Sequence, residues 1–232
     1  MKKQTNKVLT DIIKCYLLNT VYEPKEEIDL NDLLKLADAQ KLVALVYLVL
    51  KKSHIEFTDA EADIYKQYYY ASIKNATKQT RAIKKLTQSL EEKRISYCFF
   101  KGADLRKLYA PNEEIRTMGD IDVLISEKDK KAIIDEYLKQ DICKIIHYNG
   151  VDMFSLGDIH FEMHGVVNYF STDIVTTDDI VDNALPYDKY LYLLVTHIAS
   201  HISTSGCGIR QLIDIAKFYQ AYDEKIDYNQ YD

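Results

Sequence analysis

The sequence predicts an α+β fold in which a small mixed β-sheet is backed by helices, with helical N-terminal and C-terminal regions. Three observations lead to this prediction. Apolar residues recur at helical spacing from Leu9 to about Leu90. Short aromatic and alternating runs typical of strands lie between Ile95 and Val167. Gly and Pro number only 7 and 3, too few for a turn-rich all-β sandwich.

The first region, residues 1–90, is predicted to be helical. Its apolar residues recur at Leu30, Leu33 and Leu34, and again along the run Leu42–Leu50, which is read as a buried helix. Asn31 or Asp29 is a predicted cap for one of these helices. A long helix is expected from Ile64 to Leu90.

The second region, residues 91–180, is predicted to form the sheet. Its expected elements follow one another as a strand from Ile95, the turn Lys101-Gly102, the helix Ala103–Tyr109, the loop Pro111–Gly119, the strand Asp120–Ile125, the helix Glu127–Lys139, the segment Cys143–His147, the hairpin strands Val151–Leu156 and Ile159–Val167, and the loop Thr172–Asp179. The third region, residues 181–232, is helical again, with Pro186 opening one helix and a second running from Ile209 to Tyr222.

Charge and cysteine usage narrow the class of protein. A net charge of -6 and a pI near 5.6 argue against extended nucleic-acid binding, which needs clustered Lys and Arg. The four cysteines are too far apart for a zinc ribbon or a disulfide framework, so a cytoplasmic protein is expected. The longest apolar run, Leu42–Leu50, is too short to span a bilayer, and no membrane partner is expected.

Two carboxylates one residue apart form the central chemical motif, Gly119-Asp120-Ile121-Asp122-Val123. On a strand, Asp120 and Asp122 share one face while the apolar residues share the other. Like charges this close repel each other, and Mg²⁺ is the natural partner because it accepts carboxylate oxygens and keeps sites for phosphates. On its own, such a pair is more often a polar strand surface than a metal site.

Two further segments favour the metal site. The strand that contains Glu162 places His160 and His164 on the same face, so Glu162 completes a set of three carboxylates if the two strands are neighbours. Upstream, Lys101-Gly102 lies between a strand and a helix, where Gly allows close backbone approach to a phosphate.

Together these motifs resemble an uncharacterised nucleotidyltransferase family of the polymerase-β-like superfamily. The resemblance rests on Phe100–Leu105, Tyr109, Pro111, Arg116, Met118–Ile125 and Phe161–His164, and on the later His201, Arg210 and Ile213-Asp214. It implies a nucleotidyltransferase core at 91–180, two Mg²⁺ ions, replaceable by Mn²⁺, on Asp120, Asp122 and Glu162, and binding of ATP or another NTP. Members of the family extend further at the C-terminus, which implies a shortened C-terminal region here.

The resemblance also departs from the wider superfamily at the phosphate-binding turn. There a Gly-Ser pair stands shortly before the carboxylates, whereas Lys101-Gly102 lacks the serine. Lys101, Gly102, Arg116, Arg210 and Asp214 are therefore the candidates for nucleotide binding. His164 and His201 are expected to contact substrate or to support a metal ligand.

Rival interpretations remain open for the later residues. His197 and His201, with His160 and His164, could supply a four-histidine metal site. Arg210 and Asp214 stand four apart on a helix and form either an exposed ion pair or part of the nucleotide site.

Three functions follow. The first is an NTP-dependent transferase with pyrophosphate release, whose acceptor is a small molecule, a protein or an RNA end. The second is a non-catalytic nucleotide-binding or toxin-antitoxin regulatory module. The third is a histidine-metal hydrolase. The intact set of Asp120, Asp122 and Glu162 favours the transferase, while the acceptor and the oligomeric state are not encoded in any recognisable motif.

Overall fold

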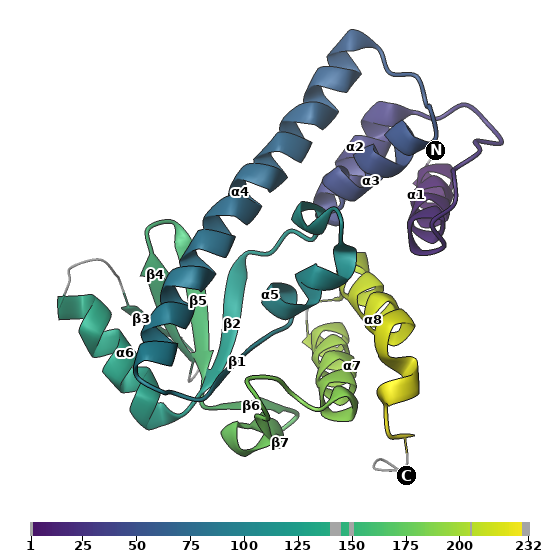
Figure 1. Cartoon of the computed structure of the whole chain (residues 1–232). Coiled ribbons are helices and arrows are strands. Elements are labelled where there is room, and N and C mark those ends of the chain that lie inside the picture. The colour runs from purple at the N-terminus through teal and green to yellow at the C-terminus, as the bar shows by residue number, and fades with distance from the viewer. Residues whose placement is uncertain (1, 140–144, 149–150, 205, 229–232) are drawn as a thin grey trace.

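The N-terminal region is a group of helices joined to the sheet by one long helix. The computed structural model describes residues 2–139, 145–148, 151–204 and 206–228. Its first helices are α1 (Lys2–Leu17), α2 (Leu30–Ala39) and α3 (Val43–Lys52). Figure 1 shows α4 (Asp59–Glu92) running from this group down to the sheet. None of the described helices is long and apolar enough to cross a membrane.

Two helix starts show how side-chain caps set the boundaries. The Asp29 side chain accepts a hydrogen bond from the backbone N–H of Asp32 and caps α2. Of the two predicted caps, Asp29 and Asn31, the structure therefore uses Asp29. Helix α4 begins at Asp59, earlier than the predicted Ile64. The reason is a capping box in which Thr58 and Glu61 satisfy each other's backbone N–H groups, a signal that the apolar pattern alone does not carry.

The main sheet has five strands in the order β1-β2-β5-β4-β3. Its strands are β1 (Tyr97–Phe100), β2 (Asp120–Ile125), β3 (Ile145–Tyr148), β4 (Val151–Leu156) and β5 (Ile159–His164). Strand β2 is antiparallel to β1 and parallel to β5, so the sheet is mixed, as predicted. The turn between β4 and β5 contains Gly157 with a φ of 63°, a conformation that suits glycine. Cys143, from the predicted segment Cys143–His147, lies outside the described residues.

The segment after β5 differs from the prediction. The expected strand does not run on to Val167, because it ends at His164, and β6 (Val166–Tyr169) starts a separate two-stranded sheet with β7 (Thr172–Thr176). The predicted loop Thr172–Asp179 is therefore a strand followed by a short 3-10 turn, Thr177–Asp179. Period-two patterning cannot tell where a strand leaves one sheet for another, which explains the error.

Two apolar layers enclose the main sheet. On one face, Ile121, Val123, Phe161 and Met163 pack against α4 and against α6 (Glu127–Lys139). On the other face, Leu124 belongs to a core with α7 (Tyr187–Thr204), α8 (Ile209–Tyr222) and the small sheet. Figure 1 shows α4 and α7 on opposite sides of β2.

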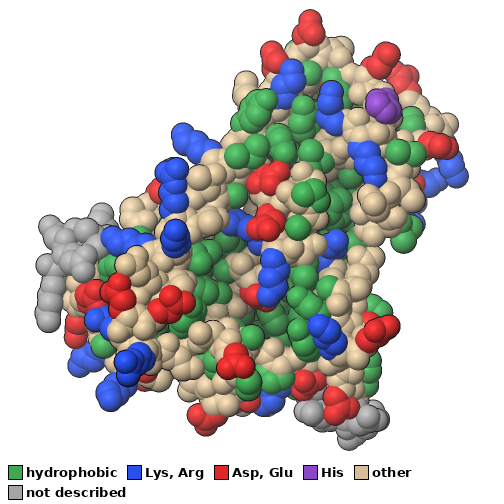
Figure 2. All heavy atoms as spheres, viewed as in Figure 1, with side chains coloured by type: hydrophobic (Ala, Val, Ile, Leu, Met, Phe, Trp, Pro, Cys, Tyr) green, Lys and Arg blue, Asp and Glu red, His purple; other side chains and the backbone are tan. Residues whose placement is uncertain are grey.

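The connection from β1 to β2 contains only short helical turns. These are α5 (Gly102–Leu105) and the 3-10 turns Arg106–Tyr109 and Glu113–Ile115, where the sequence predicted one helix from Ala103 to Tyr109 and a loop. The last helical element among the described residues is a further 3-10 turn at Asp223–Lys225. Figure 2 shows acidic and basic side chains interspersed over the face in view, with apolar side chains between them.

Candidate active site

Two of the three predicted carboxylates, Asp122 and Glu162, meet where β2 and β5 run side by side, and Asp120, which is opposite His160, lies outside their group of potential ligands. In the parallel register, Asp122 is opposite Glu162. Ile121 and Val123 point into the apolar layer, so Asp120 and Asp122 share the other face, as the alternation predicted. Ligand atoms of Asp122, Glu162 and His164 all lie within 4.8 Å of one another. The condition that the two strands be neighbours is thus confirmed.

Electrostatics separate the two aspartates. Burial raises the pKa of Asp122, but the Lys101 ammonium and the His164 imidazole outweigh it and lower that pKa to about 2. For Asp120 the Lys101 charge also lowers the pKa, but it does not outweigh the opposing causes. Burial and the charges of Asp122 and Glu162 raise its pKa above the ordinary value, so a cation near Asp120 would be strongly stabilising.

Lys101 reaches Asp122 from a strained turn. Its backbone has φ 52° and ψ -128°, a region that a residue with a side chain rarely adopts and that costs on the order of 1–3 kcal/mol. Its Nζ lies 2.7 Å from Asp122 Oδ1 and 5.2 Å from the centroid of the Phe100 ring. Strain of this kind persists where surrounding contacts fix the backbone, and here it aims an ammonium at the carboxylates.

Gly102 allows the turn after β1 to approach the segment before β2 closely. A Cβ built on Gly102 would lie 3.1 Å from Met118 Cβ and 3.4 Å from Arg116 Nη1. A residue with a side chain at this position would require the Met118 or Arg116 side chain to shift by a few tenths of an ångström. This close approach is an observed role for Gly102, whereas its contact with a phosphate stays a prediction.

Arg116 and Asp214 form a buried, two-bond ion pair. Arg116 Nε and Nη2 donate to the two carboxylate oxygens of Asp214, each at 2.6 Å, and the Tyr109 hydroxyl donates to Oδ1 at 2.6 Å. Both charged side chains are almost fully buried. The predicted exposed pair between Arg210 and Asp214 is therefore wrong, because Asp214 is turned inward toward Arg116.

Arg210 lies beside Arg116 at a shared carbonyl group. Arg210 Nη1 donates to the backbone oxygen of Thr117 at 2.7 Å, and Arg116 Nη1 donates to the same oxygen. Burial and the neighbouring Arg116 charge lower the pKa of Arg210. Of these two guanidinium groups, only Arg116 forms a two-bond pair with a carboxylate. Because the two groups share one carboxylate partner between them, together they can still donate hydrogen bonds to an anion.

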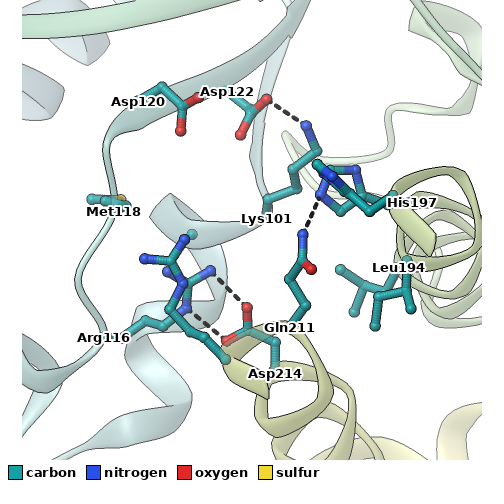
Figure 3. Close-up of a pocket in the computed structure, with 13 residues that line it drawn as sticks. Lys101, Arg116, Met118, Asp120, Asp122, Leu194, His197, Gln211 and Asp214 are labelled. Carbon is teal, nitrogen blue, oxygen red and sulfur yellow. Dashed lines mark hydrogen bonds and ion pairs between the residues drawn. The ribbon is translucent and has the colours of Figure 1, made fainter. Parts of the chain in front are cut away.

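One cavity collects most of the candidate residues (Figure 3). It lies between β2, the Lys101 turn, α7 and α8, and Figure 3 shows Asp120 and Asp122 on one side and the Arg116–Asp214 pair on another. Its wall on α7 is partly apolar, with Leu194 and Ile198. The lining residues are Lys101, Gly102, Arg116, Met118, Asp120, Asp122, Leu194, His197, Ile198, His201, Arg210, Gln211 and Asp214.

The four histidines do not come together as a metal site. His164 Nε2 lies 3.2 Å from Asp122 Oδ1, while His160 contacts Ser155 on the neighbouring strand. His197 is engaged by Tyr169 and Gln211, and His201 packs edge-on against its ring. Among the described residues, only Asp122, Glu162 and His164 form a group of three potential ligands. The four-histidine interpretation is therefore wrong, and His164 lies among the carboxylates.

Sequence reasoning missed Tyr169, Thr117 and Gln211, although each contacts a predicted site residue. Tyr169 lies between the predicted hairpin strand and the predicted loop, and Gln211 lies within the predicted last helix, but no role was predicted for either residue. No local signal marks them, because each acquires its role through contacts with residues distant in the sequence.

Fold and site define an α+β protein in which an acidic strand pair faces basic side chains across a cavity. Residues 26–232 match the model of an uncharacterised nucleotidyltransferase family, and the chain belongs to that family. Membership supports a general nucleotidyltransferase function and a nucleotide substrate. A search of curated proteins gave no match.

Proposed function

We propose that the chain transfers a nucleoside monophosphate from an NTP to a hydroxyl or similar acceptor, releasing pyrophosphate, at Asp120, Asp122 and Glu162. The observation that carries this proposal is the parallel register of β2 and β5, which sets Asp122 beside Glu162 on the polar face of the sheet. Asp120 and Asp122 line the cavity together with three cationic side chains. Two of the three carboxylates and three cations thus line the same cavity, while Glu162 lies beside Asp122 and is not among the lining residues.

The donor set fits divalent metal ions. Asp122 and Glu162 offer hard oxygen ligands close together, and the pKa of Asp120 is raised by burial first and then by the charges of Asp122 and Glu162. Carboxylate oxygens suit Mn²⁺ as well as Mg²⁺, and His164 Nε2 lies 3.2 Å from Asp122 Oδ1, where it can orient that carboxylate. Asp120, Asp122 and Glu162 would hold the ions. When bound, these ions activate the acceptor oxygen and neutralise charge on the departing pyrophosphate.

Three basic residues are suited to the triphosphate. Lys101 presents an ammonium beside Asp122, and Arg116 and Arg210 present paired guanidinium groups at Thr117. Arg116 is fixed in place by Asp214 and Tyr109, so its position costs little further ordering when substrate binds. Asp214 therefore acts on the nucleotide through Arg116, by orienting it.

The remaining lining residues shape the side of the cavity where a nucleoside or acceptor would lie. Leu194 and Ile198 form an apolar strip on α7, and His201 lies beside them. An apolar strip next to polar donors is typical of sites that hold a flat or partly apolar group in one orientation. We assign the nucleoside or acceptor to this wall and the phosphates to the opposite one.

Glu162→Gln tests the proposal most directly. The third carboxylate is expected to serve mainly the ion that activates the acceptor, so its loss should reduce single-turnover rates by roughly 10²-fold or more. Affinity for Mg-NTP should stay within a few-fold of the parent. Each labelled NTP would be incubated with Mg²⁺, the protein and cell extract, and pyrophosphate release would be measured beside calorimetric affinity.

Asp158→Asn is the matched control, because Asp158 lies exposed at the tip of the same β4–β5 hairpin. It should leave both affinity and turnover unchanged. Equal losses of affinity and rate in Glu162→Gln would show that Glu162 is structural. Tight NTP binding by a parent protein that releases no pyrophosphate with any extract would instead support a regulatory binding module.

A further inference from the structure

A second cavity lies where α1, α3 and α8 meet the turn that ends at Tyr109. Its volume is about 450 Å³, within the range of roughly 300–1,000 Å³ that is usual for small-molecule sites. Helix α8 reaches α1 here (Figure 1), and Gln220 Nε2 donates to the backbone oxygen of Leu17 at 3.1 Å. This cavity, called the α1–α8 cavity below, shares no lining residue with the candidate active site.

The described residues that line the α1–α8 cavity carry two positive charges and no negative charge. Lys52 comes from α3 and Lys217 from α8, and neither Asp nor Glu is among the lining residues. The active-site cavity, by contrast, is lined by three Lys or Arg side chains and three aspartates. Since the chain as a whole has a net charge of -6, two unbalanced lysines in one cavity make it a local site of positive potential.

Both ammonium groups are held by neutral partners. Lys52 Nζ donates to the backbone oxygen of Asn19 at 2.9 Å and to its Oδ1 at 2.7 Å. Lys217 Nζ lies 5.7 Å from the centroid of the Tyr16 ring, within range of a cation–π contact. Neutral partners fix the position of a charge without cancelling it. Because an ammonium has three N–H donors, Lys52 keeps one for a further acceptor.

The rest of the wall is largely apolar or aromatic. Leu48 and Val49 on α3 line it together with Pro111. The rings of Tyr16 and Tyr109, which also line it, stack with their centroids 6.1 Å apart and their planes at 25°. An apolar wall beside two ammonium groups suits a molecule that has an apolar body and an anionic end.

The two cavities adjoin at Tyr109. This residue lines the α1–α8 cavity, and its hydroxyl donates at 2.6 Å to Asp214, which lines the active-site cavity and pairs with Arg116. Helix α8 contributes to both as well, because Lys217 follows Asp214 by three residues. A molecule in the α1–α8 cavity would therefore lie beside the residues that fix Arg116.

We propose that the α1–α8 cavity binds a small organic anion, a phosphate or carboxylate that carries an aromatic or other apolar group. Lys52 and Lys217 bind the anionic end, and the wall of Leu48, Val49 and Pro111 contacts the apolar body. No residue of this site takes part in the transfer proposed above, so binding here does not depend on that function.

Alkylation of Cys15 by iodoacetamide tests the proposal, because this free cysteine lines the cavity. Phenyl phosphate or benzoate should slow the reaction at Cys15, followed by peptide mass spectrometry, at concentrations where inorganic phosphate and phenol have no effect. Each of the latter two offers only one half of the recognised chemistry. The stronger of the first two shows whether the anionic group is a phosphate or a carboxylate. Cys207, which contacts Gln211 on the active-site side, is the internal reference.

Substitutions of the two lysines separate binding in the cavity from nonspecific protection. Lys52→Gln and Lys217→Gln should each raise the phenyl phosphate concentration for half-protection by roughly tenfold, the loss expected for one hydrogen bond between charged groups. Lys52→Arg keeps the charge and should stay within a few-fold of the parent. Lys51→Gln is the matched control, since Lys51 is the exposed neighbour on α3 and does not line the cavity. Circular dichroism would verify that each variant is folded.

Two results would overturn the proposal. One is the failure of both phenyl phosphate and benzoate to protect Cys15 in the parent protein. The other is half-protection at the same concentration in the parent and in the folded Lys52→Gln and Lys217→Gln variants. Since the assay contains no NTP and no metal ion, either result would leave the proposed transfer standing, and a failure of the transfer assay would leave this site standing.

Discussion

The buried pair of Arg116 and Asp214 allows one substitution to be worked through in energetic terms. Asp214→Asn removes the negative charge and keeps the shape of the side chain. Arg116, whose side chain is 6% exposed, would then be a buried guanidinium facing a neutral amide. Breaking a buried ion pair by removing one partner costs about 3–5 kcal/mol, because the remaining charge is desolvated without compensation.

Structural details place the expected loss at the lower end of that range. The asparagine oxygen still accepts one of the two bonds from Arg116, and Arg116 keeps its bond to the Thr117 carbonyl. The amide that replaces the other carboxylate oxygen faces the guanidinium as a second donor. We therefore expect Asp214→Asn to lower the free energy of unfolding by about 3 kcal/mol.

Urea unfolding with linear extrapolation measures this difference. Asp38→Asn is the control, because Asp38 pairs with Lys41 on the exposed surface and such pairs contribute about 0–1 kcal/mol. Replacing Arg116 by leucine in the Asp214→Asn background removes the unpaired charge and should recover part of the loss. A loss below about 1 kcal/mol for Asp214→Asn would refute the argument that this pair is desolvated and structurally required.

Three further predictions concern charge at the site. Asp120→Asn and Asp122→Asn should each reduce turnover by roughly 10²-fold or more, and unchanged turnover at low Mg²⁺ would contradict the metal assignment. Without metal, Asp120→Asn should raise Tm, because it removes a negative charge that burial and the neighbouring carboxylates disfavour. Mg²⁺ together with NTP should raise Tm more than NTP alone. A zinc-selective chelator should leave activity intact, and activity that the chelator removes and added zinc restores would point to a histidine site. The pKa of His197 falls from 6.5 to about 3 on folding, so the unfolded chain binds a proton more readily, and the free energy of unfolding decreases as the pH is lowered below 6.5. Between pH 8 and pH 5 the parent should lose about 2 kcal/mol more of this free energy than His197→Asn. Equal losses for the two proteins in urea unfolding would show that the ring is not held neutral.

Local sequence was enough to predict most elements and the faces of the key strands. Strand β2 and helix α6 have the predicted bounds, and helix α8 runs from Ile209 to Tyr222 as expected. These agreements have a common physical cause: hydrophobic periodicity and capping act within a few residues. The errors lie where the cause is not local, as at β6 and β7, where pairing partners decide the sheet.

By itself, the sequence determined that Asp120 and Asp122 share a strand face and that Glu162 lies on a similar strand, since side-chain direction alternates along any strand. Only the tertiary structure decided that these strands are parallel neighbours with Asp122 opposite Glu162. It also decided that Asp214 pairs with Arg116 instead of Arg210, and that Tyr169 contacts His197. Such contacts depend on sheet order and helix packing over many tens of residues, and no spacing within a single segment encodes them.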